Sequence, residues 1–131
     1  MKERMVRVGG NSNMADAIAE RFLAARRAAQ GLADCPGTPP ETVAEAYAIQ
    51  DAALARVDQE IAGWKVGRIL PPLDAQYGCD RLAGPIFADT VATIAADAEG
   101  HMFADGFGAI EAEYLFRIGS TPPAGQTDFT L

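Results

Sequence analysis

Two glutamates separated by a single residue, Glu111 and Glu113, lie in the largely apolar segment IEAEYLFRI at 110–118. The alternation of residue types predicts a β-strand, whose opposite face carries an apolar row: Ile110, Ala112, Tyr114, Phe116 and Ile118. In a strand the two carboxylates share one face and lie about 6.5–7 Å apart along the backbone. Such a pair is either a solvated strand face or part of a site for a hard divalent cation, Mg²⁺ or Mn²⁺.

The segment GWKVG at 63–67 could supply a positive charge to the same chemistry. Strand alternation would place Trp64 and Val66 on one face and Lys65 on the other. The flanking glycines remove neighbouring side chains, so a ligand could approach the backbone. In a cleft the Lys65 ammonium would bind a carboxylate or an enolate oxygen, whereas outside a cleft it would be an ordinary exposed lysine.

A third candidate segment is AYAIQ at 46–50. Its Tyr47 and Gln50 are three residues apart and therefore share one face of a predicted helix. Tyr47 is most simply a core residue. The Gln50 amide on an apolar face needs hydrogen-bond partners, which a neighbouring segment or a substrate could provide.

The other reactive residue types indicate no further site. Cys35 and Cys79 lie far apart and lack the spacing of a zinc site or a disulfide framework. The only histidine, His101, lies in an expected turn, which favours a surface or loop role over a place in a Ser-His-Asp or Cys-His triad.

The elements that position these residues begin with a loose arm at 1–12. Asn13 predicts the N-terminal cap of a helix over 14–30, and Gly31 predicts its stop. Apolar residues recur on a narrow stripe of this helix, so it should lie on something larger.

A second helix is predicted from 39 to about 61. Thr38 can cap it, Pro39 suits its first turn, and Glu41 completes a capping box. Gly63 is expected to end this helix, so that 13–62 form a helical N-terminal region.

Residues 63–131 read as the β-rich part of a catalytic domain. GWKVGRIL predicts a strand broken by Pro71–Pro72, and the segment at 84–100 predicts one or two strands with a turn at 97–100. Helices followed by strands predict an α+β fold, with two N-terminal helices packed on a mixed, largely antiparallel β-sheet. The segment 110–118 is the last predicted strand, and we expect the sheet to be truncated after it. An unpaired edge would favour a homo-oligomer.

Length and composition indicate one folded domain, or a piece of a larger one. Of the 131 residues, 49% are apolar and 22% are charged, as in folded proteins. The net charge of −7 argues against nucleic acids and anionic membranes as partners. No apolar run approaches the roughly 18–20 residues that span a bilayer, and the N-terminus lacks a secretion signal, so we expect a cytoplasmic protein.

The chain resembles the 2-keto-4-pentenoate hydratase group of the fumarylacetoacetate hydrolase superfamily in three segments, namely AYAIQ, GWKVG and EAE. The resemblance extends from Asp16 to Gly119. It implies a partial fumarylacetoacetate hydrolase-like fold in which Glu111 and Glu113 are two of three carboxylate ligands to Mg²⁺ or Mn²⁺. The family's third acidic ligand would lie beyond Leu131.

The resemblance also implies a reaction, in which Lys65 is the candidate catalytic residue. We take Tyr47, Gln50 and Trp64 as candidate substrate-binding residues. The implied enzyme is a divalent-metal-dependent lyase that adds water to a 2-hydroxydienoate or 2-keto-enoate in aromatic catabolism. Its small 2-keto acid substrate would chelate the cation through carboxylate and keto oxygens, while Lys65 would hold the substrate carboxylate or balance the enolate charge.

Three alternatives stay open. The same superfamily includes decarboxylation of a 2-keto diacid such as 4-oxalocrotonate and hydrolysis of an acylpyruvate. The segment LAGPIF at 82–87 stands where hydratases often carry a PDFG-like sequence, so the residues do not select one reaction. In a different class, the chain would be a truncated, inactive form that serves as a binding or assembly subunit.

Overall fold

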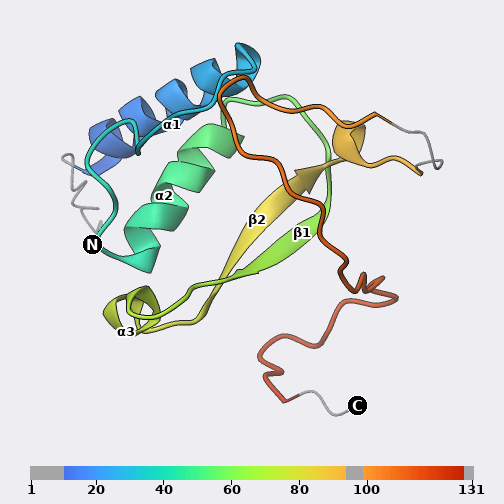
Figure 1. Cartoon of the computed structure of the whole chain (residues 1–131). Helices are drawn as coiled ribbons and strands as arrows, with labels where there is room; N and C mark the ends of the chain where they lie inside the picture. Colours follow the sequence, from blue (N-terminus) through green and yellow to red (C-terminus); the bar gives the residue numbers. More distant parts are fainter. Residues whose placement is uncertain (1–10, 94–98, 129–131) are drawn as a thin grey trace, which may run out of the picture.

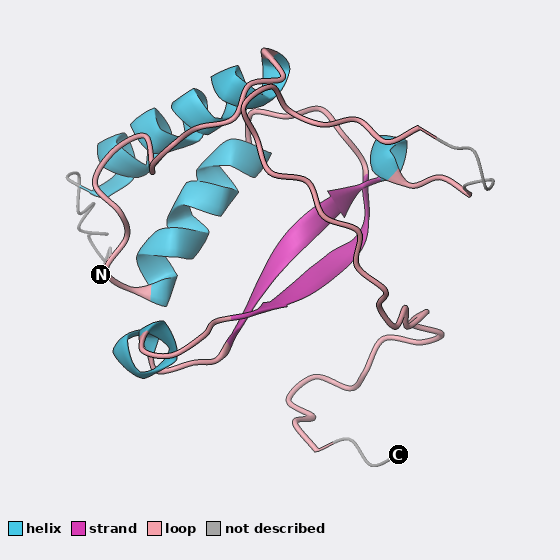
Figure 2. Cartoon of the chain, in the orientation of Figure 1, coloured by secondary structure: helices cyan, strands magenta, loops and turns pink. Residues whose placement is uncertain are grey.

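The computed structural model describes residues 11–93 and 99–128. It is a small α+β structure in which two N-terminal helices accompany a two-stranded antiparallel sheet (Figures 1 and 2). The arm expected at 1–12 falls almost wholly outside the described residues, and so does half of the turn expected at 97–100. No helix in the described part of the chain is long and apolar enough to cross a bilayer.

Helix α1 spans Asn11–Arg27, three residues earlier than predicted at each end. Asn13 lies within the helix and does not cap it, because Asn11 and Ser12 before it are residue types equally suited to a helix start. At the other end the helix stops before Gly31, since Ala29 takes a left-handed conformation with φ of 50°. The buried side of α1 supplies most of the core, with Ala15, Ile18, Ala19 and Leu23.

Helix α2 spans Val43–Leu54 and begins later than predicted. Its cap is Thr42 and not Thr38. The Thr42 hydroxyl accepts a hydrogen bond from the Glu45 N–H at 3.2 Å, and the Glu45 carboxylate accepts one from the Thr42 N–H at 3.2 Å. Proline disfavours helical geometry in the residue before it, so the helix starts only after Pro39–Pro40, where Thr42-x-x-Glu45 offers the same capping box.

The predicted end of α2 is also corrected. The helix stops at Leu54. It could not extend to the predicted end near Ile61, because Ile61 is the first residue of strand β1 and pairs with Phe87. Gly63 therefore lies inside a strand and does not terminate the helix.

The capping box gives a direct stability prediction. Thr42→Ala is expected to lower the free energy of unfolding by about 1 kcal/mol, because the Glu45 N–H loses its acceptor. Thr38→Ala is the matched control and should change it by less than about 0.5 kcal/mol. Urea unfolding followed by circular dichroism measures both. Equal losses in the two variants would contradict the assignment of the cap.

The sheet consists of β1 (Ile61–Arg68) and β2 (Arg81–Phe87). Strand β1 lies two residues earlier than the predicted strand at 63–70. A short helix, α3 (Leu73–Tyr77), follows Pro71–Pro72 and lies between the two strands in the sequence. After β2 the chain forms a 3₁₀ turn at Ala88–Thr90, so β2 is shorter than the strand region expected at 84–100.

The strand predicted at 110–118 is wrong. The structure has no strand in this segment, and its side chains are exposed (Figure 2). Alternation describes which side chains could share a face, but a strand also needs a hydrogen-bonding neighbour. The described part of the chain therefore contains a two-stranded hairpin and no larger mixed sheet.

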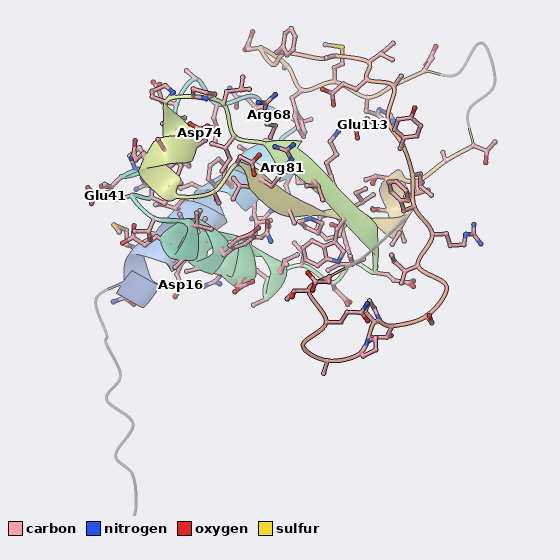
Figure 3. The ribbon with its side chains drawn as sticks, turned by 90° about the horizontal axis from the view of Figure 1, so that it is seen from below. Asp16, Glu41, Arg68, Asp74, Arg81 and Glu113 are labelled. Carbon is pink, nitrogen blue, oxygen red and sulfur yellow. The ribbon has the colours of Figure 1, made fainter. Side chains whose placement is uncertain are left out.

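The last described segment returns past α1 before it reaches the hairpin (Figure 1). Ala104 is its anchor, since its N–H donates to the carbonyl of Ala29 at 2.9 Å and its carbonyl accepts from Gly31 N–H at 2.8 Å. Beyond this anchor the chain passes beside β1 (Figure 3). The anchor thus brings the EAE segment to the strand that carries Lys65.

Candidate functional site

Strand β1 presents Lys65 on a face that glycines leave open. Gly63 and Gly67 lie two residues to either side on the same face, and Gly84 stands directly opposite on β2. A Cβ atom added at Gly63 or Gly84 would meet nothing within 4 Å. The residues next to Lys65 on this face therefore carry no side chains, and a flat ligand could lie against the backbone of the sheet.

Both glutamates of EAE converge on this lysine. The Lys65 Nζ donates to Glu111 Oε2 at 3.1 Å and also to Glu113 Oε1. Figure 3 shows Glu113 on the segment that runs beside the hairpin. The two carboxylates therefore lie together at Lys65, although an irregular segment and not the predicted strand carries them.

The two carboxylates change the protonation behaviour of the lysine. They raise the pKa of the Lys65 ammonium above its usual 10.5, with the hydrogen bond to Glu113 as the largest cause and that to Glu111 the second. Lys65 is accordingly positive at all physiological pH values.

The site lies at the surface. The side chains of Lys65, Glu111 and Glu113 are 41%, 66% and 48% exposed. Among residues 11–93 and 99–128, no group of three or more His, Cys, Asp or Glu side chains is placed to hold a metal ion. The described chain thus offers two carboxylate ligands and one cation, open to solvent.

The candidate substrate-binding residues lie elsewhere. The Tyr47 hydroxyl accepts the Ala83 N–H at 3.0 Å and so ties α2 to β2. Gln50 lines an apolar hollow of about 580 Å³ between the helices and β2. Trp64 lies on the face of β1 opposite to Lys65 and is 52% exposed. The structure therefore brings Lys65 together with the glutamates but does not bring these three residues to it.

One contributor could not be found in the sequence. Gly84 becomes part of the site only because the hairpin register places it across from Lys65. The same register puts Arg68 opposite Arg81 at the end of the hairpin near α3 (Figure 3). Arg81 is paired with Asp80 at 2.9 Å, whereas Arg68 extends the positive charge of β1.

A scan against protein-family models finds no match for this chain, and searches of curated proteins and of solved structures find none either. The resemblance to the hydratase group, read from the segments AYAIQ, GWKVG and EAE, therefore stays a prediction.

Proposed function

We propose that the chain is a divalent-metal-dependent lyase of the 2-keto-4-pentenoate hydratase type, acting on a small 2-keto acid. One observation carries the proposal: the lysine of GWKVG and both glutamates of EAE meet at a single point. These three are also the residues that the sequence resemblance assigns to one active site.

In this proposal Lys65 binds the substrate carboxylate. The lysine ammonium is positive at physiological pH, and the glycines around it leave room for a planar keto acid. The substrate carboxylate competes with Glu111 and Glu113 for the ammonium. Binding of the acid would therefore release the two glutamates for a cation.

Glu111 and Glu113 would hold Mg²⁺ or Mn²⁺. Carboxylate oxygens are the donors these ions prefer, and both side chains already approach one shared point. With no third acidic or imidazole ligand in the described ranges, the remaining coordination positions would be left for water and substrate oxygens. When bound, the cation supplies the positive charge that stabilises negative charge developing on the keto oxygen.

Metal titration tests the proposal. Excess Mg²⁺ or Mn²⁺ is expected to raise the Tm. At a metal concentration one hundred times the dissociation constant, the free energy of unfolding should rise by about 2.7 kcal/mol. The paired substitution Glu111→Gln and Glu113→Gln should abolish the rise. Asp58→Asn is the matched control, because it removes an exposed carboxylate that makes no ion pair within the described chain.

Absorbance assays then identify the reaction. Metal-dependent loss of 2-hydroxypenta-2,4-dienoate supports hydration, whereas turnover of 4-oxalocrotonate alone would assign a decarboxylase. A Tm that no divalent cation moves, together with no turnover of either acid, would overturn the proposed function.

A second candidate function is a non-catalytic binding or assembly subunit. It is favoured by the exposed apolar side chains beside EAE, among which Ile110 and Tyr114 are 103% and 93% exposed. In that case Lys65 would act as a structural ion-pair partner of the two glutamates. The metal titration separates the two functions, since a structural ion pair predicts no gain in Tm.

A further inference from the structure

Residues along β1 alternate in the direction of their backbone N–H and C=O groups, and one hydrogen bond shows which of them face β2. Ile69 N–H donates to the carbonyl of Asp80 at 2.9 Å, just beyond the end of the hairpin ladder. In an antiparallel pair the residues alternate between facing the neighbouring strand and facing away. The N–H and C=O groups of Lys65 and Gly67 therefore point toward β2, whereas those of Trp64 and Val66 point to the outer edge of β1.

Two features keep the outer edge of β2 from pairing with another strand. The Ala83 N–H, which the same alternation directs away from β1, donates a hydrogen bond to the Tyr47 hydroxyl. Pro85, the next outward-facing residue, has no N–H to offer. Proline and a covering side chain are common means of preventing an edge from pairing with another strand.

The outer edge of β1 has neither a covering side chain nor a proline. None of the described residues forms a backbone hydrogen bond with the outward groups of Trp64 or Val66. Their side chains are 52% and 60% exposed. This edge, which we call the β1 edge, is therefore an open template for another strand.

The segment 110–118 has the properties of the missing strand. Its residues alternate, and its apolar row is exposed by 74% or more at four positions, namely Ile110, Tyr114, Phe116 and Ile118. Its two glutamates complement the positive charge of Lys65 on β1, to which both are ion-paired. Among the described residues, the side-chain hydrogen bonds of this segment go to Lys65, and the segment forms no backbone hydrogen bond to the β1 edge.

We propose that the segment 110–118 of one copy adds as a strand to the β1 edge of a second copy. Exchange in both directions gives a closed pair with twofold symmetry, in which each copy donates one segment and accepts another. The added strand would cover Trp64 and Val66 and bury the apolar row that is exposed in a single chain. This inference does not depend on the proposed enzymatic function.

The first test removes one edge donor. Val66→Pro deletes an outward N–H that the hairpin does not use, whereas Val66→Thr keeps both the N–H and the β-branched shape. Analytical ultracentrifugation of the parent and Val66→Thr should show dimers. Val66→Pro should be monomeric at the same concentrations, with a dissociation constant at least about tenfold weaker. A monomeric parent, or a Val66→Pro chain as dimeric as the parent, would overturn the proposal.

The second test asks whether the strand comes from another copy. A donor-deficient chain carries Tyr114→Lys and Phe116→Lys, and it retains an intact β1 edge. Alone, this chain and Val66→Pro should both be monomers with native circular dichroism. Mixed, they should form a heterodimer, because the intact segment of the Val66→Pro chain can pair with the intact edge of the other. If mixing restores no dimer, the segment does not exchange between copies and the proposal is overturned.

Discussion

Replacing Lys65 with methionine is expected to lower kcat/KM at least about a hundredfold and to raise the affinity for Mg²⁺ about tenfold. The two effects have opposite signs because Lys65 has two roles in the proposed site. It binds the substrate carboxylate, so its loss weakens catalysis. It also occupies both glutamates, so its loss leaves Glu111 and Glu113 as adjacent negative charges without a partner.

Two measurements separate these roles. Isothermal titration with Mg²⁺ measures the gain in metal affinity, and the absorbance assay measures kcat/KM. Lys65→Arg is the control, because it keeps the charge between the glutamates and should therefore bind Mg²⁺ as weakly as the parent. If Lys65→Met bound Mg²⁺ no better than Lys65→Arg, the ammonium and the cation would not share the glutamates.

The same substitution has a consequence at alkaline pH. The folded chain raises the pKa of Lys65 above 10.5, so the ion pairs contribute stability that is present below 10.5 and is lost as the pH rises through the higher, folded value. Unfolding of the parent should therefore become easier across this alkaline window. Lys65→Met should lack this part of the pH dependence, since it has no ammonium to titrate.

Local patterns in the sequence predicted the strand that carries Lys65 and the α+β class of the fold. The alternation that separates Lys65 from Trp64 follows from the period of a strand, and β1 confirms it. The helix–strand order predicted the α+β class, and the structure confirms its two helices and antiparallel pairing. Each of these depends on residues within a few positions of one another, which is where sequence patterns are most informative.

The wrong predictions are of two kinds. In one, two segments carry the same local pattern and only one of them uses it; in the other, the outcome depends on residues far away in the chain. Thr38 and Thr42 carry the same capping spacing, and only the two prolines between them decide which one is used. The strand at 110–118 was wrong because its alternation could not reveal that no neighbour pairs with it in the chain. The place of Gly84 opposite Lys65 likewise follows from the hairpin register alone.

The second large effect is expected in the core, where Ile18→Ala should lower the free energy of unfolding by about 2–5 kcal/mol. Ile18 is only 2% exposed, and few other hydrophobic side chains in the described chain are buried: Ala15, Ala19, Leu23, Ile69 and Phe87. A hairpin of two strands is marginal without helices to support it, so a cavity at α1 should weaken the whole structure. Urea unfolding measures the loss, and Asp58→Asn provides a surface control.

A second substitution tests whether Ile18 is packed as tightly as the structure indicates. A Cβ at Gly37 would lie 2.7 Å from Ile18 Cγ1 and 3.1 Å from Cδ1, so Gly37→Ala should cost about 1–3 kcal/mol in the parent. In the Ile18→Ala background the space is free, and the cost should disappear, giving a coupling of at least about 1 kcal/mol. Gly119→Ala, whose Cβ would meet nothing within 4 Å, should be close to neutral in both backgrounds. Equal costs of Gly37→Ala in the two backgrounds would show that α1 does not pack against the loop at Gly37, and the core would then have to be placed elsewhere.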